Sequence, residues 1–228
     1  MKRFLVVSWL IVATGATTVA ADERQELQMY LKRGFEYAEK QDYEKARRSF
    51  DTAVSKYPNN ADVHYCRGSY NVDRHNYYQA LIDFDNTLKL APTAVMAMVA
   101  RGVTFVRLGQ YDRGLAEYEK VLSLHPEGAY RAAVLNARAW LEATCPDPKF
   151  RNGQKALVDA QRAVDFGGWR KASCLGTLAA AYAEVGDFDA AIKYQEMAIA
   201  AATNEDKPRD AEKHLACFRE HRPYRDQP

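Results

Sequence analysis

Glycine and proline are scarce in this 228-residue chain, with 12 and 8 copies respectively. Their scarcity excludes the collagen-like and low-complexity classes. Neither sign of charge dominates, because 32 Lys and Arg residues stand against 30 Asp and Glu residues. Without a basic excess, the chain lacks the electrostatic footprint of a general nucleic-acid-binding protein, and we expect no nucleic-acid partner. Apolar residues make up 47% of the chain, which is enough for a packed domain or a short array of repeats.

Long apolar runs are also missing, except at the N-terminus. Two basic residues precede an apolar run over 4–13, and small residues follow it. This pattern is typical of a secretory signal peptide, which we expect to occupy residues 1–21 and to be cleaved after Ala20 or Ala21. An uncleaved anchor is the alternative interpretation, because residues 4–21 carry no charge. The leader predicts a periplasmic or secreted protein, with no stable membrane span after cleavage.

Motifs that carry enzyme or metal chemistry are missing as well. The chain has no H-E-x-x-H, G-x-S-x-G, G-x-G-x-x-G or P-loop pattern. Its cysteines form no C-x-x-C pair, so neither zinc binding nor thioredoxin-like redox chemistry is indicated. Export permits disulfides. The alternative is that most of the cysteines are small buried hydrophobic residues. The cysteines concerned are Cys66, Cys145, Cys174 and Cys217. We expect no catalytic residue, no metal site and no cofactor.

The sequence does contain an internal repeat with a period of 34 residues. Five columns recur at this interval: Gly34, Gly68 and Gly102; Pro58, Pro92 and Pro126; Ala46, Ala80 and Gly114; Phe50, Phe84 and Tyr118; and Tyr43, Tyr77 and Tyr111. In the first unit, Tyr30, Gly34 and Tyr37 are spaced i, i+4, i+7, which predicts one face of a helix. The same spacing of alanine and phenylalanine at 46–53 predicts a second helix. Because one helical pair cannot bury its apolar faces alone, such units must stack into an array.

These columns resemble the tetratricopeptide-repeat (TPR) pattern, which has small residues at positions 8 and 20 and aromatic residues at positions 4 and 24. The first unit matches it with Tyr30, Gly34, Tyr37, Ala46, Phe50, Ala53 and Pro58. The family usually has leucine at position 7, where this chain has Arg33, Arg67 and Arg101. This shared departure suggests that the arginine stems lie along a partly exposed edge. The resemblance implies an all-α fold: a right-handed α-solenoid of antiparallel helix pairs, the TPR superhelix, with a C-terminal capping helix.

The resemblance divides the chain into a TPR domain over residues 22–219 and a short tail. We expect units at 27–60, 61–94, 95–128, 129–168 (expanded and degenerate) and 172–205, then a capping helix at 207–219 and a polar tail at 220–228. The expansion comes from an insertion at 144–151 whose role the sequence does not indicate. This long turn and the form of the C-terminal end resemble exported bacterial members of the family.

The resemblance also implies where a partner binds. TPR ligands lie in the concave groove lined by the first helices of the units, chiefly at positions 2, 5, 9, 12 and 13 of each. The residues expected to line this groove are Leu31, Phe35, Tyr65, Ser69, Met96, Val99, Val103 and Val106. Leu31 and Phe35 stand where the chaperone-tail clamp of some cytosolic members has Lys and Asn, so that mode of binding is disfavoured.

An apolar strip on a solvated face usually marks a partner site, and it suits an amphipathic helix or an extended segment. We therefore expect a non-enzymatic adaptor or scaffold that binds a protein or peptide partner in the bacterial cell envelope. The alternative function is an accessory subunit of an envelope enzyme or of a secretion or assembly complex. An alternative for the strip is cover by residues 22–26, by the C-terminal tail or by a second copy in a homodimer.

Polar residues that could suggest chemistry have structural explanations. His64 falls at a core position of the repeat, which predicts a buried histidine rather than a ligand. Cys145 precedes a proline in the insertion, and the residues next to it offer no base to activate it as a nucleophile. Asp187 and Asp189 lie in a turn between two helices, where we expect helix capping.

Overall fold

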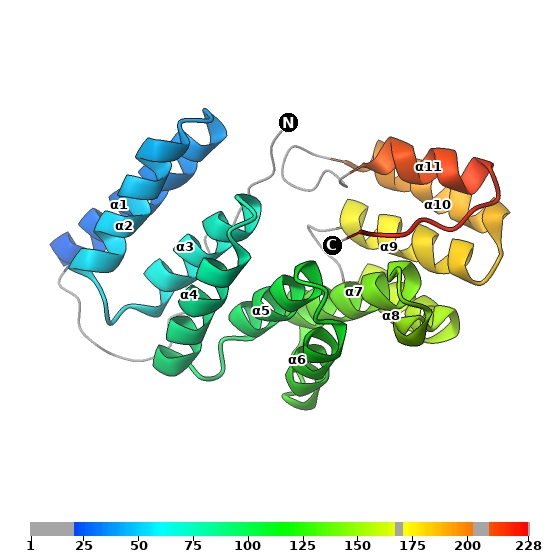
Figure 1. Ribbon diagram of the computed structural model, residues 1–228, viewed down its shortest axis with the longest axis horizontal. Coiled ribbons are helices and arrows are strands. Elements are labelled where there is room, and N and C mark those ends of the chain that lie inside the picture. The colour runs from blue at the N-terminus through cyan, green and yellow to red at the C-terminus, as the bar shows by residue number, and fades with distance from the viewer. Residues whose placement is uncertain (1–20, 167–170, 203–209, 228) are drawn as a thin grey trace. The chain divides into compact units, whose positions relative to one another are not determined.

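A computed structural model describes residues 21–166, 171–202 and 210–227 (Figure 1). Over these ranges the backbone is helical and contains no strand, so the predicted all-α class is confirmed. The predicted leader, except Ala21, lies outside the described residues, as does the start of the expected capping helix. None of the described helices is both long and apolar enough to cross a membrane.

The chain divides into two compact units, one ending at Thr104 and the other beginning at Phe105. The first unit contains α1 (Ala21–Glu39), α2 (Tyr43–Lys56), α3 (Ala61–Asp73), α4 (Tyr77–Leu90) and most of α5 (Val95–Arg107). The second contains the end of α5, then α6 (Tyr111–Ser123), α7 (Gly128–Thr144), the 3₁₀ turn η1 (Pro148–Phe150), α8 (Gly153–Phe166), α9 (Lys171–Glu184), α10 (Phe188–Ala200) and α11 (Ala211–Arg219).

Short polar turns separate the helices of each pair. The side chain of Asp42 accepts a hydrogen bond from the backbone N–H of Lys45 at 3.3 Å and caps α2. Asp187 caps α10 in the same way, with 3.0 Å to the backbone N–H of Ala190, so its predicted capping role is confirmed. Capping satisfies backbone donors that have no partner inside the helix, and each cap contributes about 1 kcal/mol.

Small residues lie where the two helices of a pair approach most closely. A Cβ atom added to Gly34 would lie 2.7 Å from the Phe50 ring, and one added to Gly68 would lie 2.7 Å from the Phe84 ring. Both rings are fully buried. The 34-residue columns of glycine and aromatic residues therefore record a packing contact between α1 and α2 that recurs between α3 and α4.

The expected edge of arginine stems describes only part of that column. Arg33 is exposed, whereas Arg67 directs its guanidinium inward and pairs with Asp83, which is fully buried. The Nη2 and Nε atoms of Arg67 lie 2.7 and 3.1 Å from Asp83 Oδ1, and Nη1 lies 3.0 Å from Asp51 Oδ1. The predicted exposed edge is therefore wrong for Arg67, because the prediction did not include a carboxylate partner for the guanidinium.

The insertion at 144–151 folds back on the second unit. The Arg151 guanidinium donates hydrogen bonds to the carbonyl oxygens of Cys145 and Pro146, at 2.9 and 3.1 Å, and to Glu184 Oε1 at 3.0 Å. On its other side, the ring of Phe150 lies 5.3 Å from that of Tyr111. The insertion therefore connects the ends of α7 and α9 to the start of α6.

Candidate functional site

Seven of the eight predicted groove residues belong to the first unit, on its first helices. Leu31 and Phe35 lie on α1, Tyr65 and Ser69 on α3, and Met96, Val99 and Val103 on α5. We call these seven residues the first-helix strip. Ser69 and Val99 are buried, at 2% and 7% exposed, whereas the other five are partly exposed. The strip thus keeps part of its apolar surface open in the first unit.

Aromatic contacts fix the strip to the core of its unit. The Phe35 ring meets the buried Phe50 ring edge to face, with 5.1 Å between centroids. The Tyr65 ring lies 6.0 Å from that of Phe84. Leu31 packs against the same core cluster as Phe35 and Tyr65. Because packing already orders these side chains, a partner that contacts them loses little side-chain entropy on binding.

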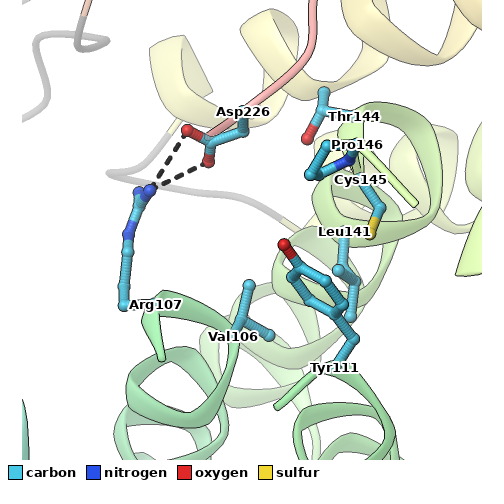
Figure 2. A pocket seen from close by; sticks show the side chains of 8 residues that line it. All are labelled: Val106, Arg107, Tyr111, Leu141, Thr144, Cys145, Pro146 and Asp226. Atoms are coloured by element: carbon cyan, nitrogen blue, oxygen red, sulfur yellow. Dashed lines mark hydrogen bonds and ion pairs between the residues drawn. The ribbon is translucent and has the colours of Figure 1, made fainter. Parts of the chain in front are cut away.

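Val106, the eighth residue, belongs to the second unit and lines a small pocket there (Figure 2). The pocket has a volume of about 10 Å³, which is room for one water molecule at most. The other lining residues are Arg107, Tyr111, Leu141, Thr144, Cys145, Pro146 and Asp226. The pocket is too small for a substrate, but it shows that the C-terminal segment lies against α5 and α7 of this unit.

The C-terminal segment is anchored to the second unit by Asp226. Arg107 Nη1 donates to both carboxylate oxygens of Asp226 at 3.1 Å, and the indole N–H of Trp140 donates to Oδ2 at 2.7 Å. The backbone N–H of Asp226 donates to the carbonyl of Thr144 at 2.9 Å. Figure 2 shows the carboxylate facing the Arg107 guanidinium. One carboxylate thus receives two charge-assisted contacts and one from a neutral donor.

The two preceding residues are held by different side chains. Arg225 Nη1 lies 2.7 Å from Glu184 Oε2 and donates to the carbonyl of Ala143 at 3.2 Å. The Tyr224 ring packs against both Trp140 and His214, with centroid distances of 6.0 and 4.2 Å. Burial lowers the pKa of His214 to about 4, so this imidazole is neutral at pH 7.

The sequence prediction treated residues 220–228 as a polar tail and only considered that it covers the predicted groove. In the structure, residues 224–226 bind α7, α9 and the end of α5 within the second unit. One signal was present in the sequence. Arg107 and Glu184 fall at position 13 of the third and fifth predicted units, with charges opposite to those of Asp226 and Arg225.

The polar residues that could suggest chemistry have structural roles. His64 is buried, and its Nε2 lies 2.8 Å from the carbonyl oxygen of Pro58, as expected of a core histidine. Cys145 is 1% exposed, and burial raises its pKa, so its thiol stays protonated. None of the four cysteines, all within the described ranges, forms a disulfide, and burial raises the pKa of Cys66 to about 12. In the described ranges, no three His, Cys, Asp or Glu side chains are grouped as metal ligands.

Family comparison agrees with the repeat seen in the sequence. Family models described as tetratricopeptide repeat match residues 31–95, 67–132 and 172–205. Among curated proteins, none matches the chain. The family matches cover more than half of the residues, including the helices that carry the first-helix strip.

Solved structures give the same fold. Cut9, from the APC/C Cut9–Hcn1 hetero-tetramer, is 16% identical with a TM-score of 0.71; the match covers 86% of this chain and 36% of Cut9. TTC0263, a TPR protein of Thermus thermophilus, is 17% identical with a TM-score of 0.65, covering 85% and 99% of the two chains. PilW, a type IV pilus biogenesis factor, is 19% identical with a TM-score of 0.62, covering 85% and 84%. The chain thus spans about a third of Cut9. At these identities the similarity shows the fold alone, and it confirms the predicted α-solenoid class.

Proposed function

Because this chain belongs to the tetratricopeptide-repeat family, we propose that it is a non-enzymatic adaptor or scaffold, and that it binds a helical or extended segment of a partner protein. The family consists in general of such scaffolds, and its members bind protein partners. The leader favours a bacterial cell envelope location, either periplasmic or secreted.

The observation that carries this proposal is the first-helix strip. Leu31, Phe35, Tyr65, Met96 and Val103 are apolar or aromatic, and each is partly exposed on three successive first helices. A helix with residues at i, i+4 and i+7, or an extended segment with alternating apolar side chains, would cover such a strip. The contacts of Phe35 and Tyr65 with buried rings keep the surface ordered before the partner arrives.

The test is crosslinking and capture of the tagged protein in cells, with two matched variants. Val103→Asp places a charge in the strip, whereas Tyr78→Asp places the same charge on α4, where Tyr78 is 72% exposed. We expect the Val103→Asp variant to capture at least tenfold less partner than the parent chain, and the Tyr78→Asp variant to capture as much as the parent. The reason is that burying a carboxylate in a contact without water has a high free-energy cost. Circular dichroism and thermal melting must show that both variants stay folded.

Two results would contradict the proposal. Equal capture by the parent chain and both variants would move the interaction away from the strip. Unfolding by Val103→Asp alone would mean that the strip is core. The proposed location has its own test, since cleavage after Ala20 or Ala21 predicts a defined N-terminus in the mass spectrum of the exported protein.

A further inference from the structure

We propose that the second unit contains a second peptide-binding site, and that the chain's own C-terminal segment fills it. A partner segment that displaces this tail has the same chemistry, with an aromatic residue, a cationic residue and a carboxylate residue in succession. This inference rests on the proposed function, because it concerns a partner segment of the same adaptor. It assigns the ligand chemistry of a surface separate from the first-helix strip.

The tail is bound mainly through side chains, as a peptide ligand would be. The three consecutive residues Tyr224, Arg225 and Asp226 contact the Trp140–His214 pair, Glu184 and Arg107 respectively, and Trp140 also donates to Asp226. A single described backbone hydrogen bond, from Asp226 to Thr144, connects this stretch to a helix. Three successive side-chain contacts make the site selective for the sequence of its ligand, because each contact excludes residues of the wrong charge or size.

Charge complementarity fixes the direction of the segment. Arg107 requires a carboxylate, and Glu184 requires a cation one residue earlier. The reverse sequence would place like charges together at both positions, which disfavours binding. Trp140 adds a geometric requirement, because its indole N–H reaches Asp226 while its ring faces Tyr224.

Two of the receptor side chains, Glu184 and Trp140, keep other contacts that do not depend on the tail. Glu184 is held by Arg151, which is itself bound to two carbonyl oxygens of the insertion. The Trp140 ring also lies 5.4 Å from that of His214 on α11. These two side chains are therefore held in place whether or not the tail is bound. This assigns a role to the insertion, which orients Glu184.

The Arg107–Asp226 pair is open enough to exchange. The two side chains are 27% and 17% exposed, so water reaches both partners and can solvate them when the pair opens. As a tethered ligand, however, the tail competes at an effective concentration on the order of millimolar. A partner in trans must exceed this competition, so the tail sets a threshold for binding.

The experiment uses the full chain and a fluorescent peptide of residues 222–227, Arg-Pro-Tyr-Arg-Asp-Gln. Asp226→Lys in the protein should release the tail, so the peptide should bind this variant at least tenfold more tightly than it binds the parent chain. Glu220→Lys is the matched control, with the same change of charge on a side chain that is 63% exposed, and it should behave as the parent. Fluorescence anisotropy gives each Kd.

Two further arms test specificity. An Asp226→Lys version of the peptide should bind the Asp226→Lys protein at least tenfold more weakly than the original peptide. Adding Arg107→Glu to the protein should cause a similar loss for the original peptide. If Asp226→Lys lowers the helical circular dichroism signal, the milder Asp226→Ala variant takes its place in every arm.

Three outcomes would overturn the inference. They are no peptide binding by a folded tail-released variant, equal binding by variant and parent, or binding indifferent to the charge at Arg107. A parent dimer that becomes monomeric with Asp226→Lys would assign the site to the tail of a second copy instead. The peptide assay contains no cellular partner, so its failure would not contradict the proposed binding of a partner to the first-helix strip. In the same way, failure of the capture experiment would not contradict the peptide result.

Discussion

Replacing Arg67 with methionine should destabilise the first unit more than the loss of any exposed ion pair. The Asp83 carboxylate is fully buried and accepts hydrogen bonds from Arg67 Nη2 at 2.7 Å and from Asn71 Nδ2 at 3.0 Å. After Arg67→Met the carboxylate keeps the neutral amide of Asn71 and the His64 ring, whose Nδ1 lies 3.9 Å from Asp83 Oδ1, but no guanidinium. Removing one partner of a buried pair costs about 3–5 kcal/mol, because it leaves an uncompensated charge in a low-dielectric site.

The double variant Arg67→Met/Asp83→Leu should recover most of that loss. Removing both partners leaves no buried charge, and replacing a buried pair with apolar residues is often neutral in stability. The free energy of unfolding of the double variant should therefore lie within about 1–2 kcal/mol of the parent. The two single changes would then be strongly non-additive, as expected for groups in direct contact.

The assay is urea unfolding followed by circular dichroism at equal protein concentrations. With a slope of about 1–3 kcal/mol per molar urea, the single variant should shift the midpoint of the first unit's transition by roughly 1–5 M. Arg47→Met is the control, since the Arg47 side chain is 54% exposed and its pairs with Glu44 and Asp51 contribute little. A loss below about 1 kcal/mol for Arg67→Met, or additivity in the double variant, would refute the argument.

Two further changes test the packing and the titration of the fold. Gly68→Leu should lower the melting temperature through overpacking that costs about 1–3 kcal/mol or more, because any Cβ at this position meets the Phe84 ring at 2.7 Å. An unchanged melting temperature would contradict the repeat register. The free energy of unfolding should fall as the pH drops from about 6.5 towards 4, because the unfolded chain binds a proton at His214 that the folded chain, with a pKa of about 4, does not. The loss of unfolding free energy is at most about 3 kcal/mol. It is measured from the urea midpoints of the parent chain and the His214→Phe variant at pH 7, 5 and 4. If the midpoint falls as steeply with pH in the variant as in the parent, groups other than His214 cause the loss.

The repeat register could be predicted from the sequence because the same packing contact recurs in each repeat and uses the same residue types. Gly34 and Gly68 contact Phe50 and Phe84 in equivalent places, so each contact leaves a column in the sequence. The arginine–aspartate contacts leave a column too. Arg67 pairs with Asp51 and Arg101 pairs with Asp85, each over 16 residues, and the two aspartates are themselves one period apart. The column of aspartates was therefore visible in the sequence, but the interpretation of the arginine stems as an exposed edge did not include it.

Other features left no periodic signal. Gln41, His75 and Gly109 recur at the repeat interval and all have positive φ, between 58° and 72°. These three positions share a backbone conformation but not a residue type, so the common turn cannot be recognised from the sequence. The contact of Asp226 with Arg107 joins residues 119 apart, once in the chain, and nothing repeats it. Sequence therefore predicted the scaffold, and the strip residues lie on the helices it indicated, but it did not predict the contacts of the C-terminal segment in the second unit.

The contact between Arg107 and Asp226 also changes how the second unit should come apart. In a linear array each repeat contacts only its neighbours, so the last helices can fray while the rest stays folded. Here Asp226 is joined to Arg107, near the start of the second unit, across 119 residues. Closing so long a loop has an entropic cost that is recovered only when all the intervening helices are in place. While the tail is bound, fraying of α11 should therefore be suppressed, so that α11 approaches α7 in its protection from hydrogen exchange.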